Sequence, residues 1–477
     1  MERILSVEQM RAADDYTIGK LGISSDILAE RAGRAVAEEI TRRFRGGRVL
    51  VCIGKGNNGK DGAIIASILS QLHGFSVKTL SVSNGIFKLL DMDYDIIVDC
   101  IFGIGLNREV EGKYKTAIEK INRSGAFIVA CDIASGLNGD TGRAMGVAVK
   151  ADLTVAIQEF KLGHFLNDGP DYSGEVVARD IGISIWGEDY SFRLNDDDAK
   201  VFFKKRKRNV NKGDFGKAIV IGGSKKFPGS VLLSYSALCA LRAGAGYSVL
   251  AVPESLYGVY SARIPECIME TVSDNGTGIV YDEKTLANFL CYDSIAFGMG
   301  MGVTEDVYES LKYIIQNYKG NLIIDADGIN VLSLYGKDIL EKKKCKILLT
   351  PHVGEFSRLI KANKDMIMSD VISLSREFAK KYGVVLLVKS AVSVITDGDK
   401  SIINTAGSSC MAKGGSGDVL SGFASGIFAR EDISVESAAA AAYIFGKAGE
   451  ICEKEQNGYT VTASDLINAL PRAVSSL

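Results

Sequence analysis

The residues best suited to chemistry lie in a glycine-rich stretch near the C-terminus that ends in an aspartate. Gly414, Gly415 and Gly417 precede Asp418, which begins a helix of small residues. Glycines before a helix let backbone N–H groups converge on an anion, because no Cβ blocks the approach. A carboxylate there is expected to be ionised and to accept a proton from a substrate hydroxyl. The alternative is a glycine-rich turn in which Asp418 only caps the helix.

A second glycine-rich segment lies in the first half of the chain. Residues 48–53 read as a buried strand, residues 54–62 read Gly-Lys-Gly-Asn-Asn-Gly-Lys-Asp-Gly, and residues 63–73 read as a helix. Strand, glycine-rich loop and helix form the phosphate-binding arrangement of dinucleotide folds. The glycine spacing differs from Gly-x-Gly-x-x-Gly, so a standard nicotinamide dehydrogenase is not supported.

Polar residues follow two further strands of this half. Asp99 ends one apolar run, Asp132 ends the next, and Ser135 follows closely. In a parallel sheet the carboxyl ends of neighbouring strands line one crevice, so these residues should converge with Asn58. Their hard oxygen atoms suit an alkali or Group 2 cation. The alternative is that each aspartate caps the turn after it.

Length and composition bound the class of protein. A chain of 477 residues suggests two or three domains, and we place the boundary at 208, after the basic run 204–208, giving domains 1–208 and 209–477. A net charge of −2 gives no field for nucleic acid or a membrane surface. Nine cysteines without a Cys-x-x-Cys pair predict neither zinc nor disulfides. No signal peptide or membrane span is evident, so we expect a cytoplasmic protein.

The second half alternates strands and helices throughout. Short apolar runs end in glycine or polar clusters, as at residues 294–302, 321–327, 347–355 and 384–393. This pattern predicts a three-layer α/β domain with its site along one edge of the sheet.

The motifs of the first half resemble those of the NAD(P)HX epimerases. The resemblance rests on Glu-Arg-Ala-Gly at 30–33, the loop at 54–62, Phe-Gly-x-Gly-Leu-x-Arg at 102–108 and Asp-Ile-x-Ser-Gly-Leu at 132–137. It implies a Rossmann-like, doubly wound domain that interconverts the R and S forms of hydrated NADH or NADPH with bound potassium. The implied substrate-binding residues are Asn57, Asn58, Gly59, Lys60, Asp61, Gly103, Ile104, Gly105, Leu106, Asn107, Arg108, Glu109 and Asp132. Asn58, Asp99 and Ser135 would hold potassium, Asp132 would be the acid–base group, and Lys161 is a second catalytic candidate.

The motifs of the second half resemble the NAD(P)HX dehydratases, a branch of the ribokinase-like superfamily. They include Phe-Pro-Gly at 227–229, Gly-Met-Gly-Met-Gly at 298–302, Thr-Pro-His-x-Gly-Glu at 350–355 and Gly-Gly-Ser-Gly-Asp at 414–418. The resemblance implies dehydration of the S form with ADP or ATP and magnesium, catalysed by Asp418. Implied substrate contacts are Ser230, Gly302, His352 and Asp418. Implied nucleotide contacts are Lys389, Ser390, Ala391, Val392, Ser393, Gly414, Gly415, Ser416 and Gly417.

Several positions depart from the family motifs, and two other readings of the chain follow. Lys60, Ala134 and Asn138 replace residues usual in the epimerases, and Ser390 replaces a glycine beside the nucleotide. One alternative is therefore a first domain that is a binding or scaffold module without turnover. The other is a small-molecule kinase of the vitamin type in the second domain. We expect a homo-oligomer acting on NADHX or NADPHX, with no nucleic-acid or membrane partner.

Overall fold

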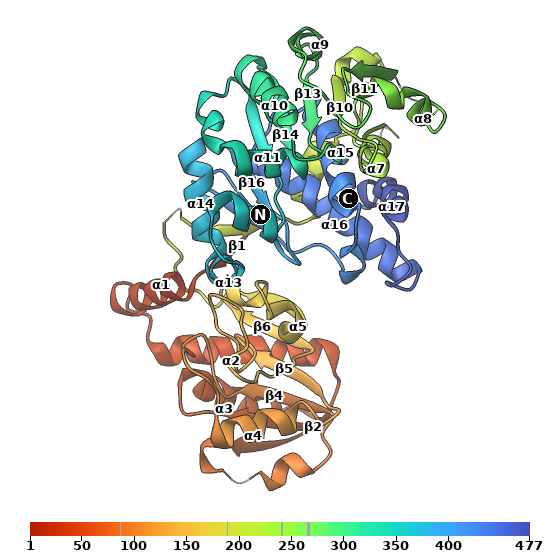
Figure 1. Cartoon of the computed structure of the whole chain (residues 1–477). Coiled ribbons are helices and arrows are strands. Elements are labelled where there is room, and N and C mark those ends of the chain that lie inside the picture. The colour runs from red at the N-terminus through yellow and green to blue at the C-terminus, as the bar shows by residue number, and fades with distance from the viewer. Residues whose placement is uncertain (86, 188, 240–241, 265–267) are drawn as a thin grey trace. The chain divides into compact units, whose positions relative to one another are not determined.

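The computed structural model describes residues 1–85, 87–187, 189–239, 242–264 and 268–477. The chain forms two compact units (Figure 1). The first unit is Arg3–Tyr190, and the second is Ser191–Leu477 together with Met1–Glu2.

The first unit is built on a parallel sheet of six strands in the order β3-β2-β4-β5-β6-β8. The strands are β2 (Gly47–Ile53), β3 (Phe75–Ser81), β4 (Ile96–Cys100), β5 (Phe127–Cys131), β6 (Leu153–Ile157) and β8 (Glu175–Arg179). A short parallel pair, β1 (Glu2–Leu5) with β7 (Phe160–Lys161), joins Leu5 to Lys161. Chain order reverses at β2 and β4, where a doubly wound sheet opens its crevice.

Helices cover both faces of this sheet, because the central strands are apolar on both sides. Val49 and Val51 face one core with α1 (Val7–Gly19), α2 (Ser25–Arg43) and α3 (Asn57–Ser70). Leu50 and Cys52 face a second core with α4 (Gly112–Ile121). A further short helix, α5, spans Gly169–Ser173. The predicted Rossmann-like, doubly wound architecture is confirmed.

The second unit has a longer sheet in the order β12-β11-β10-β13-β14-β15-β16-β17-β18-β9. Among the strands that the structure describes, only β17 runs antiparallel to both its neighbours. The strands are β9 (Ser191–Arg193), β10 (Lys217–Ile221), β11 (Tyr247–Pro253), β12 (Ile268–Val272), β13 (Ser294–Phe297), β14 (Asn321–Ile324), β15 (Lys346–Leu349), β16 (Val385–Val388), β17 (Ser393–Thr396) and β18 (Ser401–Asn404).

Two helical layers pack on this sheet, so the unit has three layers, as the sequence predicted. One layer covers the face that carries Ala218 and Val220, and it includes α7 (Pro228–Cys239), α15 (Ser416–Phe428), α16 (Val435–Glu455) and α17 (Ala463–Ser475). The other layer covers the face that carries Ile219 and Ile221, and it includes α9 (Glu283–Phe289), α10 (Glu305–Asn317), α11 (Asp327–Tyr335), α12 (Val353–Ile360), α13 (Lys364–Ser369) and α14 (Val371–Tyr382). Two short helices remain, α6 (Asp196–Lys200) and α8 (Tyr257–Ser261).

The compact units divide between Tyr190 and Ser191, because β9 pairs with β18 and so extends the second sheet. The domain boundary at 208 stays a prediction. One sequence expectation needs correction. Helix α3 begins at Asn57 rather than at residue 63, so most of the glycine-rich motif forms the first turns of a helix. Gly59 permits this, since a Cβ there would meet the Gly54 carbonyl.

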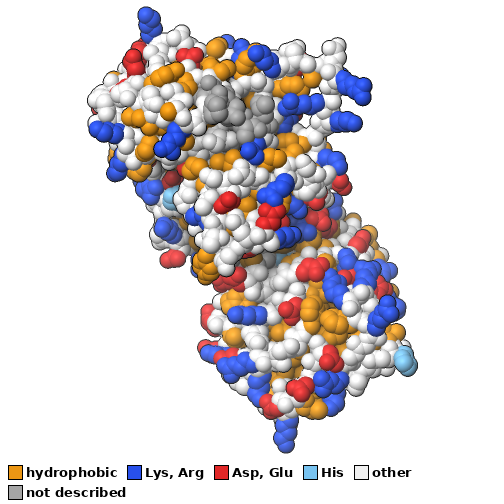
Figure 2. Space-filling model, turned by 90° about the vertical axis from the view of Figure 1, so that its right-hand side faces the viewer, with side chains coloured by type: hydrophobic (Ala, Val, Ile, Leu, Met, Phe, Trp, Pro, Cys, Tyr) orange, Lys and Arg blue, Asp and Glu red, His pale blue; other side chains and the backbone are white. Residues whose placement is uncertain are grey.

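Charged side chains of both signs are mixed on the face shown in Figure 2, where Lys and Arg are interspersed with Asp and Glu. The basic run 204–208 is exposed, and its Arg206 donates a 2.8 Å hydrogen bond to the Gly244 carbonyl. Among the described residues, no helix combines the length and apolar character needed to span a bilayer.

Candidate active sites

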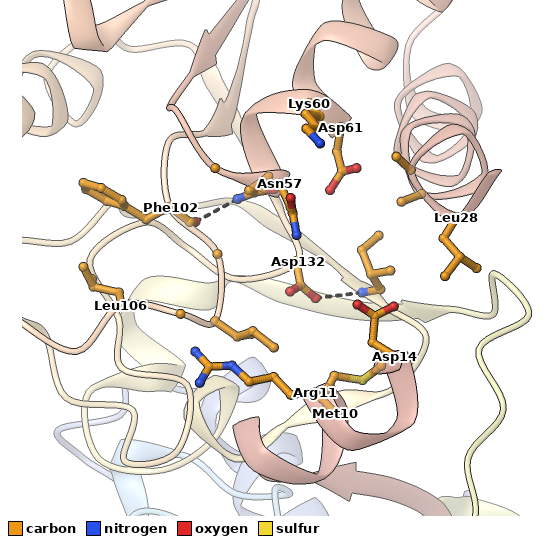
Figure 3. A pocket seen from close by; sticks show the side chains of 18 of the residues that line it. Met10, Arg11, Asp14, Leu28, Asn57, Lys60, Asp61, Phe102, Leu106 and Asp132 are labelled. Carbon is orange, nitrogen blue, oxygen red and sulfur yellow. Dashed lines mark hydrogen bonds between the residues drawn. The ribbon is translucent and has the colours of Figure 1, made fainter. Parts of the chain in front are cut away.

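The first unit contains a cavity of about 710 Å³ at the carboxyl ends of its strands (Figure 3). Its wall is formed by α1, α2, the start of α3, the segment after β4 and the ends of β5 and β6. Of the residues predicted to bind substrate, those that line it are Asn57, Asn58, Lys60, Asp61, Gly103, Ile104, Gly105, Leu106, Asn107, Arg108 and Asp132. Gly59 and Glu109 do not line it. Lys161 does.

Asp132 sits at the end of β5 with φ of 68°, a left-handed conformation that is costly for most residues other than glycine. Such strain, about 1–3 kcal/mol, persists only where the surroundings hold it. Here the Asp132 N–H donates to the Val155 carbonyl at 2.9 Å. The Ile157 N–H donates to Asp132 Oδ1 at 3.1 Å. The carboxylate is thereby aimed into the cavity (Figure 3).

Two buried residues of the following segment fix Asp132 further. The Lys161 ammonium forms an ion pair with Asp132 Oδ1 and also donates to the Ile157 carbonyl at 2.6 Å. His164 Nδ1 accepts the Lys161 N–H at 3.1 Å, so its protonated Nε2 donates to the Asp132 carbonyl at 2.8 Å. The ion pair compensates the carboxylate charge, and His164 holds the strained peptide. The sequence did not single out His164 for this role.

The three residues predicted to hold a cation also come together. Ser135 Oγ donates to Asp99 Oδ1 at 2.7 Å, and the Ser135 N–H donates to Oδ2 at 2.7 Å. Asn58 Nδ2 donates to the Phe102 carbonyl at 2.7 Å. Asn58 Oδ1 is buried without a hydrogen-bond partner among the described residues. Burial raises the pKa of Asp99 to about 6, against the hydrogen bonds from Ser135.

An unpaired buried acceptor beside a buried carboxyl is costly unless a cation compensates both. The donor set is entirely oxygen, which suits a hard, weakly hydrated cation such as potassium. The residues present therefore fit the ion that the sequence resemblance implies.

Helix α1 contributes a wall that sequence reasoning missed. Arg11 and Asp14 point into the cavity (Figure 3). Burial raises the pKa of Asp14, and the charges of Asp15 and Asp132 add to the shift. The only signal in the sequence was an acidic pair on an otherwise ordinary amphipathic helix, which is common on exposed faces.

A second constellation lies in the second unit, at the start of α15. Gly415 caps this helix with φ of 92°, and a Cβ on Gly415 would meet Leu233 Cδ1 at 2.6 Å. Glycine is therefore required there. Asp418 lies in the first turn rather than at the cap, so the reading of Asp418 as a simple N-cap is wrong. Ser230, on α7, donates a hydrogen bond to the Asp418 carboxyl.

The protonation of Asp418 differs from the sequence expectation. Burial, followed by the charge of Asp325, raises its pKa to about 7, although Lys389 and Ser230 oppose the shift. The helix terminus does not hold it fully ionised at neutral pH. A carboxyl with a pKa near the working pH is well suited to accept a proton.

Asp325, at the end of β14, organises the floor of this site. Lys389 Nζ donates to its Oδ1 at 2.7 Å, and Ser421 Oγ donates to its Oδ2 at 2.6 Å. Desolvation lowers the pKa of Lys389, but the charges of Asp325 and Glu355 outweigh it and the pKa is raised. Ala326 has φ of 49°, so each unit holds a strained non-glycine residue at a strand end.

The remaining predicted substrate residues surround this floor. The Gly302 N–H donates to Asp327 Oδ2 at 2.8 Å. His352 caps α12, and its Nδ1 accepts the Gly354 N–H at 2.9 Å. The His352 side chain is 55% exposed, and its Nε2 lies 3.7 Å from Glu355 Oε1. Burial raises the pKa of Glu355 to about 7.

The predicted nucleotide residues lie on two neighbouring segments. The loop 389–393 joins β16 to β17, and its Ser390 Oγ donates to the Val392 carbonyl at 2.6 Å. Gly414 and Gly415 lead into α15, which begins at Ser416, and a Cβ on Gly417 in its first turn would lie 3.1 Å from Lys389 Nζ. Both predicted nucleotide loops therefore meet at the ammonium of Lys389.

Comparison with known proteins shows the family to which the chain belongs. A family model described as NAD(P)H-hydrate dehydratase matches residues 218–472, and one described as YjeF-related protein N-terminus matches residues 25–88 and 83–163. A bifunctional NAD(P)H-hydrate repair enzyme of Thermofilum pendens is 31% identical over 100% of this chain and 97% of its own length. That of Archaeoglobus fulgidus is 33% identical over 95% of each. The chain belongs to the family of bifunctional NAD(P)H-hydrate repair enzymes.

Solved structures confirm the ribokinase-like fold predicted for the dehydratase half of this family. An ADP/ATP-dependent NAD(P)H-hydrate dehydratase from Bacillus subtilis, co-crystallised with ATP and Mg²⁺, covers 60% of this chain and 98% of its own, with a TM-score of 0.51 at 23% identity. A ribokinase-like superfamily protein from Enterococcus faecalis covers 61% of this chain and 98% of its own, with a TM-score of 0.51 at 24% identity.

Proposed function

We propose that the chain restores hydrated NADH and NADPH by two reactions, one in each unit. The first unit interconverts the R and S epimers, and the second dehydrates the S epimer with a nucleotide. The observation that carries this proposal is a carboxylate near a lysine in each unit: Asp132 paired with Lys161 at the end of β5, and Asp418 near Lys389 in the first turn of α15. Full-length similarity to bifunctional relatives supports the pairing of the two reactions on one chain.

In the dehydratase site, the substrate hydroxyl is a poor leaving group until it carries a phosphate. Asp418 takes the hydroxyl proton as the phosphoryl group is transferred, a role worth about 10²–10⁴ in rate. The amides at 414–417 and the N-terminus of α15 stabilise the charge on the moving phosphoryl group. Phosphate then leaves with the electron pair of the carbon–oxygen bond, and loss of a proton from the adjacent ring carbon restores the double bond. Ser230, Gly302 and His352 position the substrate.

ADP or ATP is held by the loops 389–393 and 414–417, where the charge of Lys389 favours phosphate binding. Magnesium, when bound, neutralises phosphate charge. Among the described residues, no group of three His, Cys, Asp or Glu side chains forms a metal cage. We therefore infer that magnesium is held mainly by the phosphates, as is usual for this ion.

In the epimerase site, Asp132 is the acid–base group, and Lys161 holds it in place. Asn58, Asp99 and Ser135 would hold potassium, which would supply the positive charge that compensates this buried group of oxygens. Residues 57–61, 103–108 and Glu109 contact the substrate. The retained Asp132–Lys161 pair argues against a scaffold that has lost turnover.

The test incubates the full chain with ADP or ATP and purified S epimer, and follows the return of the reduced nicotinamide absorbance. The same assay with purified R epimer reports the epimerase. A small-molecule kinase would instead accumulate a phosphorylated alcohol without restoring the absorbance. Failure to restore absorbance from the S epimer with either nucleotide contradicts the proposal.

Three further expectations belong to the same proposal. The described cysteines are all free, which supports a reducing, cytoplasmic setting. The dehydratase activity should reside in the unit that begins at Ser191. A homo-oligomer is expected by resemblance, and light scattering of the purified chain tests it.

A further inference from the structure

The cavity of the first unit contains an acidic residue that is neither a proposed potassium ligand nor part of the Asp132–Lys161 ion pair. Asp61 lies in the second turn of α3 and lines the cavity wall. In Figure 3 its carboxyl group points from α3 toward the side of the cavity where Asp132 lies. Within the described parts of the chain, its carboxyl group has no hydrogen-bond or ion-pair partner. Asp61 is partly buried, and burial of an acidic group without a partner favours its neutral form.

The charges that face Asp61 favour its protonated form. Burial raises its pKa to about 7, and the charges of Asp132 and Asp14 add to the shift, while Lys60 opposes it. Asp132, by contrast, has the Lys161 ammonium against its carboxylate. Two carboxyl groups of one cavity therefore lie in opposite environments, a pattern that in enzymes separates an acid from a base.

We propose that Asp61 is a second catalytic residue of the epimerase, which acts as the acid partner of Asp132 across the cavity. This inference rests on the proposed epimerase function. The sequence resemblance gave Asp61 only as a substrate contact, whereas its position in the cavity wall on the side of Asp132 suits it to exchange a proton with the substrate.

The step balances without any oxidant or reductant. Asp61 donates its proton to the hydroxyl oxygen, and the carbon–oxygen bond breaks to release water. The lone pair of the adjacent ring nitrogen forms the double bond of an iminium ion. A second water then forms a bond to the same carbon on the opposite face, and Asp132 takes its proton. The reverse reaction exchanges the two roles, as microscopic reversibility requires.

This route makes a prediction that does not depend on any variant. In water enriched in ¹⁸O, each epimerised molecule should carry one solvent oxygen at the inverted carbon, after subtraction of exchange without enzyme. Mass spectrometry of the separated epimers measures this. Retention of the original oxygen would mean that the carbon–oxygen bond never breaks, and the proposal would be overturned.

The variant test uses Asp61→Asn, Asp61→Glu and a matched control. We expect Asp61→Asn to lower the epimerase kcat about 10²–10⁴-fold with KM for the R epimer changed less than about threefold. Asp61→Glu should recover part of the rate because it restores an acid. Asp15→Asn, an exposed neighbour of Asp14 outside this cavity, should match the unchanged chain. Emission of Trp186, the single tryptophan, reports that this unit is folded.

The outcomes distinguish the catalytic role of Asp61 from the epimerase activity on which it rests. A raised KM with unchanged kcat, or full activity of Asp61→Asn, shows that Asp61 only binds substrate and overturns the inference while the epimerase stands. If the unchanged chain leaves the R epimer untouched, the epimerase assignment itself fails and takes the role of Asp61 with it.

Discussion

Replacement of Asp418 by asparagine should strongly slow dehydration of the S epimer and, at alkaline pH, make the protein more stable. The carboxyl group has an ordinary pKa of 3.8 and a pKa of about 7 in the folded chain, because burial and Asp325 disfavour its charge. Asparagine has the same size, keeps a hydrogen-bond acceptor for Ser230 and carries no charge. The variant therefore removes both the proton acceptor and the cost of ionising it in this site.

The magnitude follows from the pKa difference. A rise from 3.8 to about 7 corresponds to at most about 4 kcal/mol. The folded state holds the proton more tightly than the unfolded state, so this contribution to stability is present below pH 4 and is lost as the pH rises toward 7. Asp418 is partly exposed, so screening reduces the value, and about 2 kcal/mol is expected at pH 8.

The assay combines denaturation with turnover. Urea unfolding of the full chain is followed at pH 8 and pH 4 by far-ultraviolet circular dichroism, and Trp186 emission separates the transition of the first unit. Dehydration of the S epimer should fall about 10²–10⁴-fold. Asp399→Asn is the matched control in the same unit, since Asp399 is exposed and its ion pair with Lys380 lowers its pKa. It should not gain stability or lose activity.

Two results would refute the reasoning. If Asp418→Asn dehydrates the S epimer at the normal rate, the carboxyl group is not the base. If the variant is less stable than the unchanged chain at pH 8, the Asp418 charge is compensated in the folded state and its pKa is not raised. The wild-type rate should also fall about tenfold per pH unit below pH 7 if the base must be ionised.

Three further predictions concern the first unit. Asp132→Ala should abolish conversion of the R epimer and leave dehydration of the S epimer unchanged, as measured with each purified epimer. Asn58→Ala should raise the potassium concentration for half-maximal epimerase activity about 10–100-fold, because it removes the orphaned buried oxygen; rates in a potassium titration test this. Glu39→Gln should lower the free energy of unfolding by about 3 kcal/mol at pH 7, because the buried Glu39 carboxylate accepts hydrogen bonds from Arg43 and Arg179. Urea unfolding measures the difference, which should disappear as the pH falls through the lowered pKa of Glu39.

Local sequence patterns predicted most of the strands and helices, because the spacing of apolar residues and the positions of glycines indicate where each element begins and ends. Residues 48–53 form β2 almost as expected, and the polar residues after β4 and β5 meet at one edge because parallel strands end together. The prediction for the motif at 54–62 was wrong in one respect, the start of the following helix. Its glycines suggested a loop, whereas close packing of Gly59 on the Gly54 carbonyl allows α3 to begin at Asn57.

What the sequence by itself determined was the chemistry available at each strand end: a carboxylate, an amide or a glycine at a fixed place in a known alternation. What only the tertiary structure decided was the state of those groups. Burial sets the protonation of Asp418 and Asp61, while the partner Lys161, 29 positions along the chain, compensates Asp132. Desolvation and charge pairing depend on distances between segments remote in sequence, so no local pattern encodes them.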